Sequence, residues 1–190
     1  MTASSNPNLY APPRAEVADV RDRAAADLEF FPVSPTKLLV MSVCTLHFYV
    51  LYWFYQHWMC VKRREEPDIW PAARALFAIF WVYPLFKHIR ARETALRISP
   101  VLAAGPIATF YIVLALLWRL PPPYALIAYL STFLLLPAQS HANQVNEVAA
   151  PRHDRNDKLV GWNWVAVIVG GLFFVLVVVG NLVPRYAHMR

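Results

Sequence analysis

The sequence lacks the short motifs that mark the common classes of catalytic site, and only 16% of its residues are charged. It has no nucleophile elbow, no phosphate-binding glycine loop, no HExxH zinc motif and no CxxC pair. We therefore expect no catalytic residue, no cofactor and no metal site, and the pattern disfavours an enzyme.

Cysteine is scarce as well, and a cleavable signal peptide is not visible. Cys44 and Cys60 fall in one predicted helix, where a rise of about 1.5 Å per residue separates them far beyond disulfide reach.

Residues 1–33 contain no continuous apolar segment behind a basic start. We expect these residues to form a cytoplasmic arm, partly disordered, and the first membrane helix to direct insertion.

Apolar residues are abundant. They make up 58% of the chain and aromatic residues make up 14%, whereas soluble domains are roughly 45–50% apolar. The formal charge of +6 arises from Lys and Arg residues at the ends of apolar runs, where membrane proteins keep them. This pattern indicates a lipid bilayer as partner and argues against nucleic acid.

The apolar runs predict an all-α polytopic transmembrane helical bundle with about five spans in a single membrane domain, residues 34–190. The first span is well marked, because Ser34-Pro35 is a cap followed by proline and residues 38–61 contain no Asp, Glu, Lys or Arg. Spans near 71–89, 100–119, 124–138 and 160–183 follow. The second is short, and if it lies in the interface instead there are four spans.

Lys and Arg counts favour one orientation. With five spans and the N-terminus inside, the cytoplasmic segments hold eleven of these cations and the outer segments hold seven. If residues 71–89 do not span, the N-terminal arm and residues 62–74 exchange sides and the count is unchanged. Both arrangements place residues 139–159 in the cytoplasm and the C-terminus outside.

Two helix faces carry polar or small residues inside the predicted spans. The first-span stripe comprises Ser42, Thr45, Tyr49, Tyr52 and Gln56. It is typical of interhelical hydrogen bonding, and a lining for a substrate path is the alternative. The last span has a face for helix packing, which comprises Asn163, Ala166, Gly170 and Asn181. His47 lies off the first stripe, and we expect it to bond to a neighbouring helix.

The end of the fourth span offers the most suggestive cluster, a candidate site for a polar ligand or partner. It comprises Gln139, His141, Asn143, Asn146 and Glu147. All but His141 follow an i, i+4, i+7, i+8 pattern and share one face if the helix continues past Pro137. A solvated helix end is the plainer interpretation, and the segment HDRNDK that follows is most simply a charged loop.

The segments NPNLYAPPRAEVADV, FFPVSPTKLLVMSVCTLHFYVLYWFYQHW and PAARALFAIFWVYPLF resemble a group of small uncharacterised bacterial inner-membrane proteins. The group has an Asn-Pro-Tyr-Ala-Pro-like tail and a Tyr-Trp-Phe-Tyr end to its first membrane helix. Here Asn8-Leu9 separates Pro7 from Tyr10. The resemblance implies a bacterial cytoplasmic membrane and a helical bundle, and it transfers no catalytic residue.

These observations favour a non-enzymatic accessory or interaction protein of the inner membrane, which binds another membrane protein or a second copy of itself. A small transporter or channel subunit that uses the polar stripe of the first span is the alternative. A membrane enzyme would require the cluster at the end of the fourth span to face a lipid-accessible pocket.

Overall fold

The computed structural model describes residues 28–121 and 124–182, and within these residues every element is a helix. The elements are α2 (Pro35–Cys44), α3 (Phe48–Arg64), α4 (Pro71–Leu76), α5 (Ala78–Ala95), α6 (Ala104–Leu116), η1 (Leu117–Arg119), η2 (Tyr124–Leu134), α7 (Leu135–Ala149) and α8 (Trp162–Leu182). The all-helical prediction is confirmed for this part of the chain.

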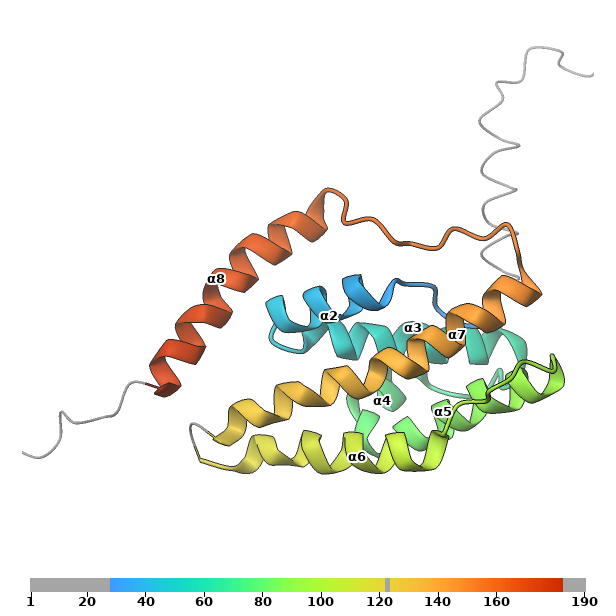
Figure 1. Ribbon diagram of the computed structural model, residues 1–190, viewed down its shortest axis with the longest axis horizontal. Helices are drawn as coiled ribbons and strands as arrows, with labels where there is room; N and C mark the ends of the chain where they lie inside the picture. The colour runs from blue at the N-terminus through green and yellow to red at the C-terminus, as the bar shows by residue number, and fades with distance from the viewer. Residues whose placement is uncertain (1–27, 122–123, 183–190) are drawn as a thin grey trace, which may run out of the picture.

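The first predicted span is a helical hairpin. Ser34 caps α2 as expected, since its hydroxyl accepts a hydrogen bond from the Lys37 amide at 3.2 Å and Pro35 occupies the first helical position. The chain then turns at His47, whose φ of 71° lies in the left-handed region, and α3 runs back alongside α2 (Figure 1). The structure thus differs from the single helix expected over residues 38–61.

The tip of this hairpin satisfies its own backbone. The amides of Thr45, Leu46, His47 and Phe48 donate to the carbonyls of Met41, Val43, Ser42 and Thr45 at 2.8–3.2 Å. The Thr45 hydroxyl also accepts from the Tyr49 amide at 2.9 Å and so caps the start of α3. No glycine or proline marks this turn, and the apolar sequence continues through it, which explains why the sequence pattern predicts one helix.

Residues 71–89 also differ from the expected single helix. Phe77 separates α4 from α5, and α5 continues to Ala95. A single span would carry its two ends to opposite surfaces of the membrane. Instead, Glu66 contacts both Arg74, at 3.1 Å, and His88, at 3.3 Å, so both ends of this segment lie at the same end of the molecule.

A third hairpin pairs α6 and η1 with η2 and α7 (Figure 1). The span expected from residue 100 begins later, since α6 begins at Ala104, and Ser99-Pro100 before it forms a cis peptide bond. Helix η2 passes directly into α7, so the chain is helical from Tyr124 to Ala149 and does not break at Pro137. This helix extends eleven residues beyond the expected end at residue 138.

Helix α8 packs along α2, contacts η2 where Phe174 meets Tyr129, and exposes most of its other side chains. Gly170 makes the close approach possible, because a Cβ there would collide with the backbone carbonyl of Cys44. Asn163 near the start of α8 lies 3.2 Å from the Lys37 ammonium, so α2 and α8 run in the same direction. The outward side chains are apolar, and Ile168 and Leu172 are 66% and 65% exposed.

Charged residues gather at one end of the helices, whereas exposed apolar residues extend along the helices to the other end. The hairpin arms near their tips expose Phe80, Phe110, Trp118 and Phe133. The other end is the polar cap, which comprises Glu29, Arg64, Glu65, His88, Arg92, Glu93, His141 and Asn146. Among the described residues, two helices are long and apolar enough to cross a membrane, Tyr124–Ala149 and Trp162–Asn181.

Candidate functional site: an amide clamp on an extended segment

Four consecutive backbone carbonyls, from Phe30 to Val33, are each bound by the side-chain amide of an Asn or Gln. The donors, in the order of the carbonyls, are Asn146 at 2.8 Å, Gln139 at 3.1 Å, Asn156 at 3.1 Å and Asn143 at 2.9 Å. The Phe30 amide also donates to Asn146 Oδ1 at 3.0 Å. We name the four donors the amide clamp.

The local sequence explains why residues 30–33 need this clamp. Pro32 and Pro35 each lack a backbone donor, and the residue before a proline is held in an extended conformation. An extended segment cannot satisfy its own carbonyls, yet Phe30 and Val33 are fully buried. Because buried backbone groups require partners, the amide side chains provide the bonds that a helix or strand would provide elsewhere.

Helix α7 positions three of the clamp residues. Gln139, Asn143 and Asn146 lie at i, i+4 and i+7, and therefore on one face. Gln139 joins this face to α3, since its Oε1 accepts from Trp53 Nε1 and lies 3.1 Å from His57 Nε2. Its amide nitrogen also donates to Asn143 Oδ1 at 2.7 Å. The result is a connected network that fixes the 30–33 segment between α3 and α7.

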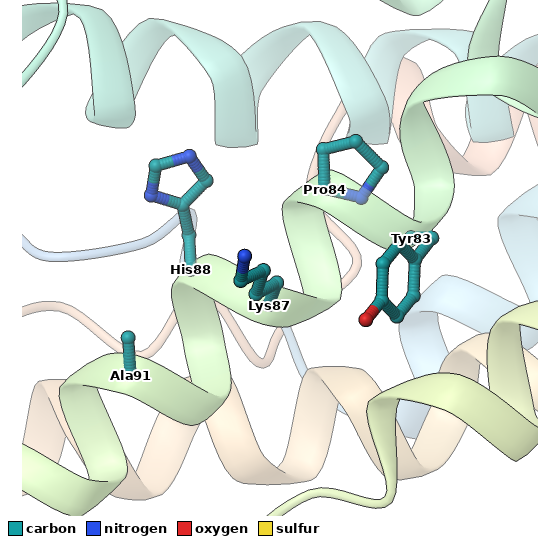
Figure 2. A pocket seen from close by; sticks show the side chains of 5 residues that line it. All are labelled: Tyr83, Pro84, Lys87, His88 and Ala91. Carbon is teal, nitrogen blue, oxygen red and sulfur yellow. The ribbon is translucent and has the colours of Figure 1, made fainter.

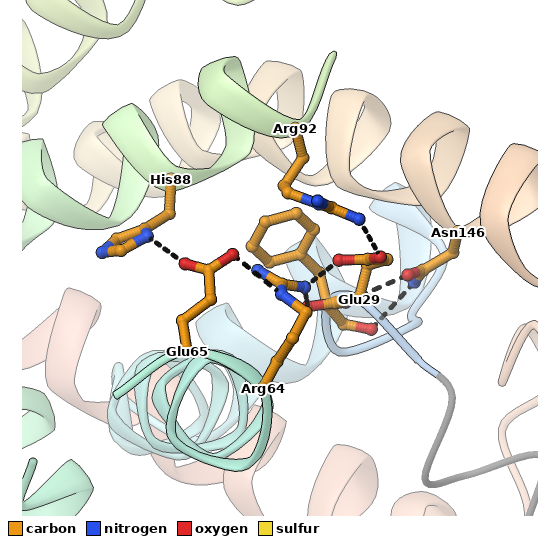
Figure 3. A network of polar contacts seen from close by, with 7 residues as sticks. Glu29, Arg64, Glu65, His88, Arg92 and Asn146 are labelled. Atoms are coloured by element: carbon orange, nitrogen blue, oxygen red, sulfur yellow. Dashed lines mark hydrogen bonds and ion pairs between the residues drawn. The ribbon is translucent and has the colours of Figure 1, made fainter. Parts of the chain in front are cut away.

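Glu29, directly before the clamped segment, forms the centre of the polar cap. Its carboxylate pairs with Arg64 from α3 and Arg92 from α5 (Figure 3). Arg64 Nη1 also donates to the Glu29 carbonyl at 2.8 Å, and its guanidinium lies 5.2 Å from the centre of the Phe30 ring. The ends of α3 and α5 therefore meet at the start of the extended segment.

Glu65 extends this network toward α5. It accepts from Arg64 Nε at 2.9 Å and lies 3.0 Å from His88 Nδ1 (Figure 3). Partial burial raises the pKa of the Glu65 carboxyl, but Arg64 and His88 together outweigh burial and hold the pKa below its ordinary value. The carboxylate is thus kept ionised at the cap.

His141 does not share the clamp face. It lies half a turn away on α7 and contacts Glu93, a fully buried carboxylate on α5. Glu93 Oε2 accepts from the Leu102 amide at 2.7 Å, which secures the connection between α5 and α6. Glu93 was not among the residues singled out from the sequence, because the apolar run that predicts the second span ends before it.

Glu147 also lies apart from the clamp. Its side chain is 48% exposed and pairs with Arg155 at 3.2 Å, and Arg155 is 66% exposed. An exposed pair of this kind contributes little to stability. Of the five candidate residues, the structure thus brings together Gln139, Asn143 and Asn146, and it separates His141 and Glu147 from them.

The polar stripe of the first span is divided by the turn at His47. Ser42 and Tyr49 are buried, whereas Tyr52 is 45% exposed and Gln56 is half-buried. Thr45 uses its hydroxyl locally, donating to the Met41 carbonyl at 2.6 Å. The stripe residues therefore do not form one face of a continuous helix.

His47 contacts a neighbouring helix at the hairpin tip. Its Nε2 lies 3.0 Å from the Thr132 hydroxyl, and its ring packs 4.5 Å from the ring of Tyr129. Both partners belong to η2, so this histidine links two hairpins.

The four residues of the packing face on α8 have different surroundings. Gly170 contacts α2, and Asn163 lies near Lys37. Ala166 packs against the core. Asn181 donates within its own helix, to the Val177 carbonyl at 2.7 Å.

Asn156 completes the clamp from the loop that precedes α8. It accepts from the Lys37 ammonium at 2.7 Å while donating to Pro32. Burial lowers the pKa of Lys37, and the nearby Asp154 and Asp157 partly oppose this. The HDRNDK segment, expected to be a charged loop, thus contributes a structural asparagine, and its composition alone gave no signal of that role.

Comparison with known proteins yields no relative. No protein-family model matches the chain, and no curated protein or solved structure matches it.

Proposed function

We propose that this chain is a multi-pass integral membrane protein of the bacterial cytoplasmic membrane and that it acts as a non-enzymatic accessory or interaction protein. The observation that carries the proposal is the separation along the helices of an exposed apolar end from a bonded polar cap. A soluble protein would not expose Phe80, Trp118, Ile168 and Leu172 by 60% or more each. The resemblance to bacterial inner-membrane proteins supports the choice of membrane.

The distribution of cations supports a topology based on hairpins. Arg64 and Arg92 share Glu29, and Lys37 bonds to the loop before α8. Among the described Lys and Arg residues, Arg119 ends η1 near the tip of one hairpin, and Arg74, in the last turn of α4, pairs with Glu66. Under the positive-inside rule the polar cap is then cytoplasmic and the end of α8 is outside.

In this topology the α2–α3 and α4–α5 hairpins enter the bilayer and return, while α8 and the α6–α7 hairpin carry the full crossings. A turn at membrane depth requires satisfied backbone donors. The amides of residues 45–48 meet that requirement through bonds within the tip. Residues 62–74 are then cytoplasmic, and not external as five straight spans would have them.

Cysteine labelling decides between the two topologies. On a background with Cys44→Ala and Cys60→Ala, single cysteines are introduced as Asp68→Cys, Asp154→Cys and His188→Cys, and spheroplasts are treated with an impermeant maleimide. We expect labelling of position 188 alone. Labelling of position 68 would restore the five-span arrangement, and labelling of position 154 would reverse the orientation.

The contacts of the clamp support an interaction role. By fixing residues 30–33 and Glu29 in the polar cap, the clamp determines where residues 1–27 join the bundle. The N-terminal arm is thus attached at the cytoplasmic face, beside the charged ends of α3 and α5. We propose that this arm and the polar cap form the surface that binds a partner membrane protein or a second copy of the chain.

The clamp residues are satisfied by the chain itself, which weighs against a transport path. Gln139 and Asn146 are fully buried and bonded to backbone, and the polar stripe of the first span is divided. A transporter would require polar groups that face a continuous path across the membrane.

Affinity purification in mild detergent tests the role directly. The full chain, the Asn146→Ala variant and a variant lacking residues 1–27 are cross-linked in cells and purified in parallel. We expect a cross-linked assembly with the full chain that is lost in both variants. Recovery of a monomer in every case, together with substrate flux in proteoliposomes, would refute the accessory role.

A further inference from the structure

One face of α5 changes from apolar to cationic along its length. Phe80, Tyr83, Lys87, Arg90 and Thr94 follow one another at spacings of three and four residues, so they share that face. Phe80 is 75% exposed and Tyr83 is 48% exposed, and both cations are exposed. About 15 Å along the helix axis separates Phe80 from Arg90.

Two hollows border Lys87 on this face. One, of about 440 Å³, is lined by Tyr83, Pro84, Lys87, His88 and Ala91 (Figure 2). The other is about 540 Å³. It shares Tyr83, Lys87 and Ala91, adds Arg90 and Thr94, and ends against the first turn of α6 at Ala104, Gly105 and Pro106. The two hollows form a groove that runs beside the cationic half of the row.

The cations of this groove differ from the other cations near the cap. Arg64, Arg74 and Arg92 each pair with a glutamate. Lys87 and Arg90 form no ion pair with any carboxylate in the described ranges, 28–121 and 124–182. Their positive charge is therefore available to an anion in the groove.

We infer that this groove binds the headgroup phosphate of an anionic phospholipid, with an acyl chain lying along Tyr83 and Phe80. The inference rests on the proposed membrane location. A free phosphate would contact only Lys87 and Arg90. The same face of α5 continues into the exposed aromatic side chains of Tyr83 and Phe80, which suit a hydrocarbon chain. Tyr83 lies between the two parts, at the position that interfacial tyrosines take in membrane proteins.

Native mass spectrometry of the purified full chain tests the site, with phosphatidylglycerol or phosphatidylcholine added to the detergent. The Lys87→Gln/Arg90→Gln variant removes both groove cations. The Arg63→Gln/Arg152→Gln variant is the matched control, because it removes two exposed cations that line neither hollow. Since each cation near a lipid surface contributes about 1 kcal/mol, we expect the groove variant to bind phosphatidylglycerol about 30-fold more weakly and the control to bind like wild type.

Three outcomes would overturn the site. The first is that wild type binds phosphatidylglycerol and phosphatidylcholine equally. The second is that both variants bind phosphatidylglycerol equally weakly. The third is that inorganic phosphate saturates the groove at the same concentration as phosphatidylglycerol does. Membrane fractionation of the same samples separates this failure from that of the proposed function. A chain recovered in the soluble fraction would refute the membrane proposal itself, whereas a membrane-integrated chain without lipid preference refutes only the groove.

Discussion

The bonds between Asn146 and Phe30 give the sharpest test of the amide clamp. Asn146→Ala removes the acceptor for the Phe30 amide and the donor to the Phe30 carbonyl, and Phe30 is fully buried. Each buried polar group left without a partner costs about 1–3 kcal/mol. Allowing for water that enters the space left by the side chain, we expect about 3 kcal/mol of lost local stability.

Hydrogen exchange measures this loss directly. A decrease of about 3 kcal/mol in the free energy of local opening corresponds to roughly 150-fold faster exchange of the Phe30 amide. The exchange is followed by mass spectrometry on peptides that cover residues 28–34 in detergent micelles. Gln144→Ala is the matched control, because Gln144 is exposed on the same helix.

Equal exchange in the two variants would refute the clamp. If Asn146→Ala left the 28–34 peptide as protected as wild type, other contacts would hold the segment and the amide bonds would be incidental. If both variants accelerated exchange equally, the effect would arise from α7 as a whole. Protection lost in Asn146→Ala alone supports the amide clamp.

Three further predictions concern α8, the buried carboxylate and the exposed one. Gly170→Leu forces a side chain against the Cys44 carbonyl, so we expect a loss of about 1–3 kcal/mol in stability and a lower unfolding temperature in detergent. Gly180→Leu, in open space, should change neither. Glu93→Ala removes the acceptor of a buried amide and the partner of the half-buried His141. We expect it to lower thermal stability in detergent by about 2–4 kcal/mol, and an unchanged midpoint would contradict the assigned contacts. Glu147→Gln affects only an exposed pair, and a change above about 0.5 kcal/mol would mean that this carboxylate is paired more tightly than described.

The sequence predicted helices and caps better than it predicted turns. Ser34-Pro35 identified the start of α2, and the i, i+4, i+7 spacing placed Gln139, Asn143 and Asn146 on one face. The turns at His47 and Phe77 were missed, because apolar residues continue through both of them and neither position is a glycine or proline. Hydrophobic length alone does not distinguish a straight span from a hairpin of two shorter helices.

The identity of the clamped ligand was also beyond the sequence. Three amides on one helix face indicate a polar partner, but the partner is a backbone segment more than 100 residues away in the chain. Only the folded arrangement shows that residues 30–33 fill the site. Glu93 and Asn156 were missed for a similar reason, since each acquires its role from a contact with another element.

The proposed topology determines which parts of the chain must be carried through the bilayer during biosynthesis. In the proposed topology the tip at residues 45–48 stops within the lipid and exposes no unpaired backbone amide. Only the connection after Arg119 and the segment beyond α8 have to be translocated. The remaining cationic segments stay on the side where the ribosome releases them, so insertion requires the passage of few charges through the hydrocarbon core.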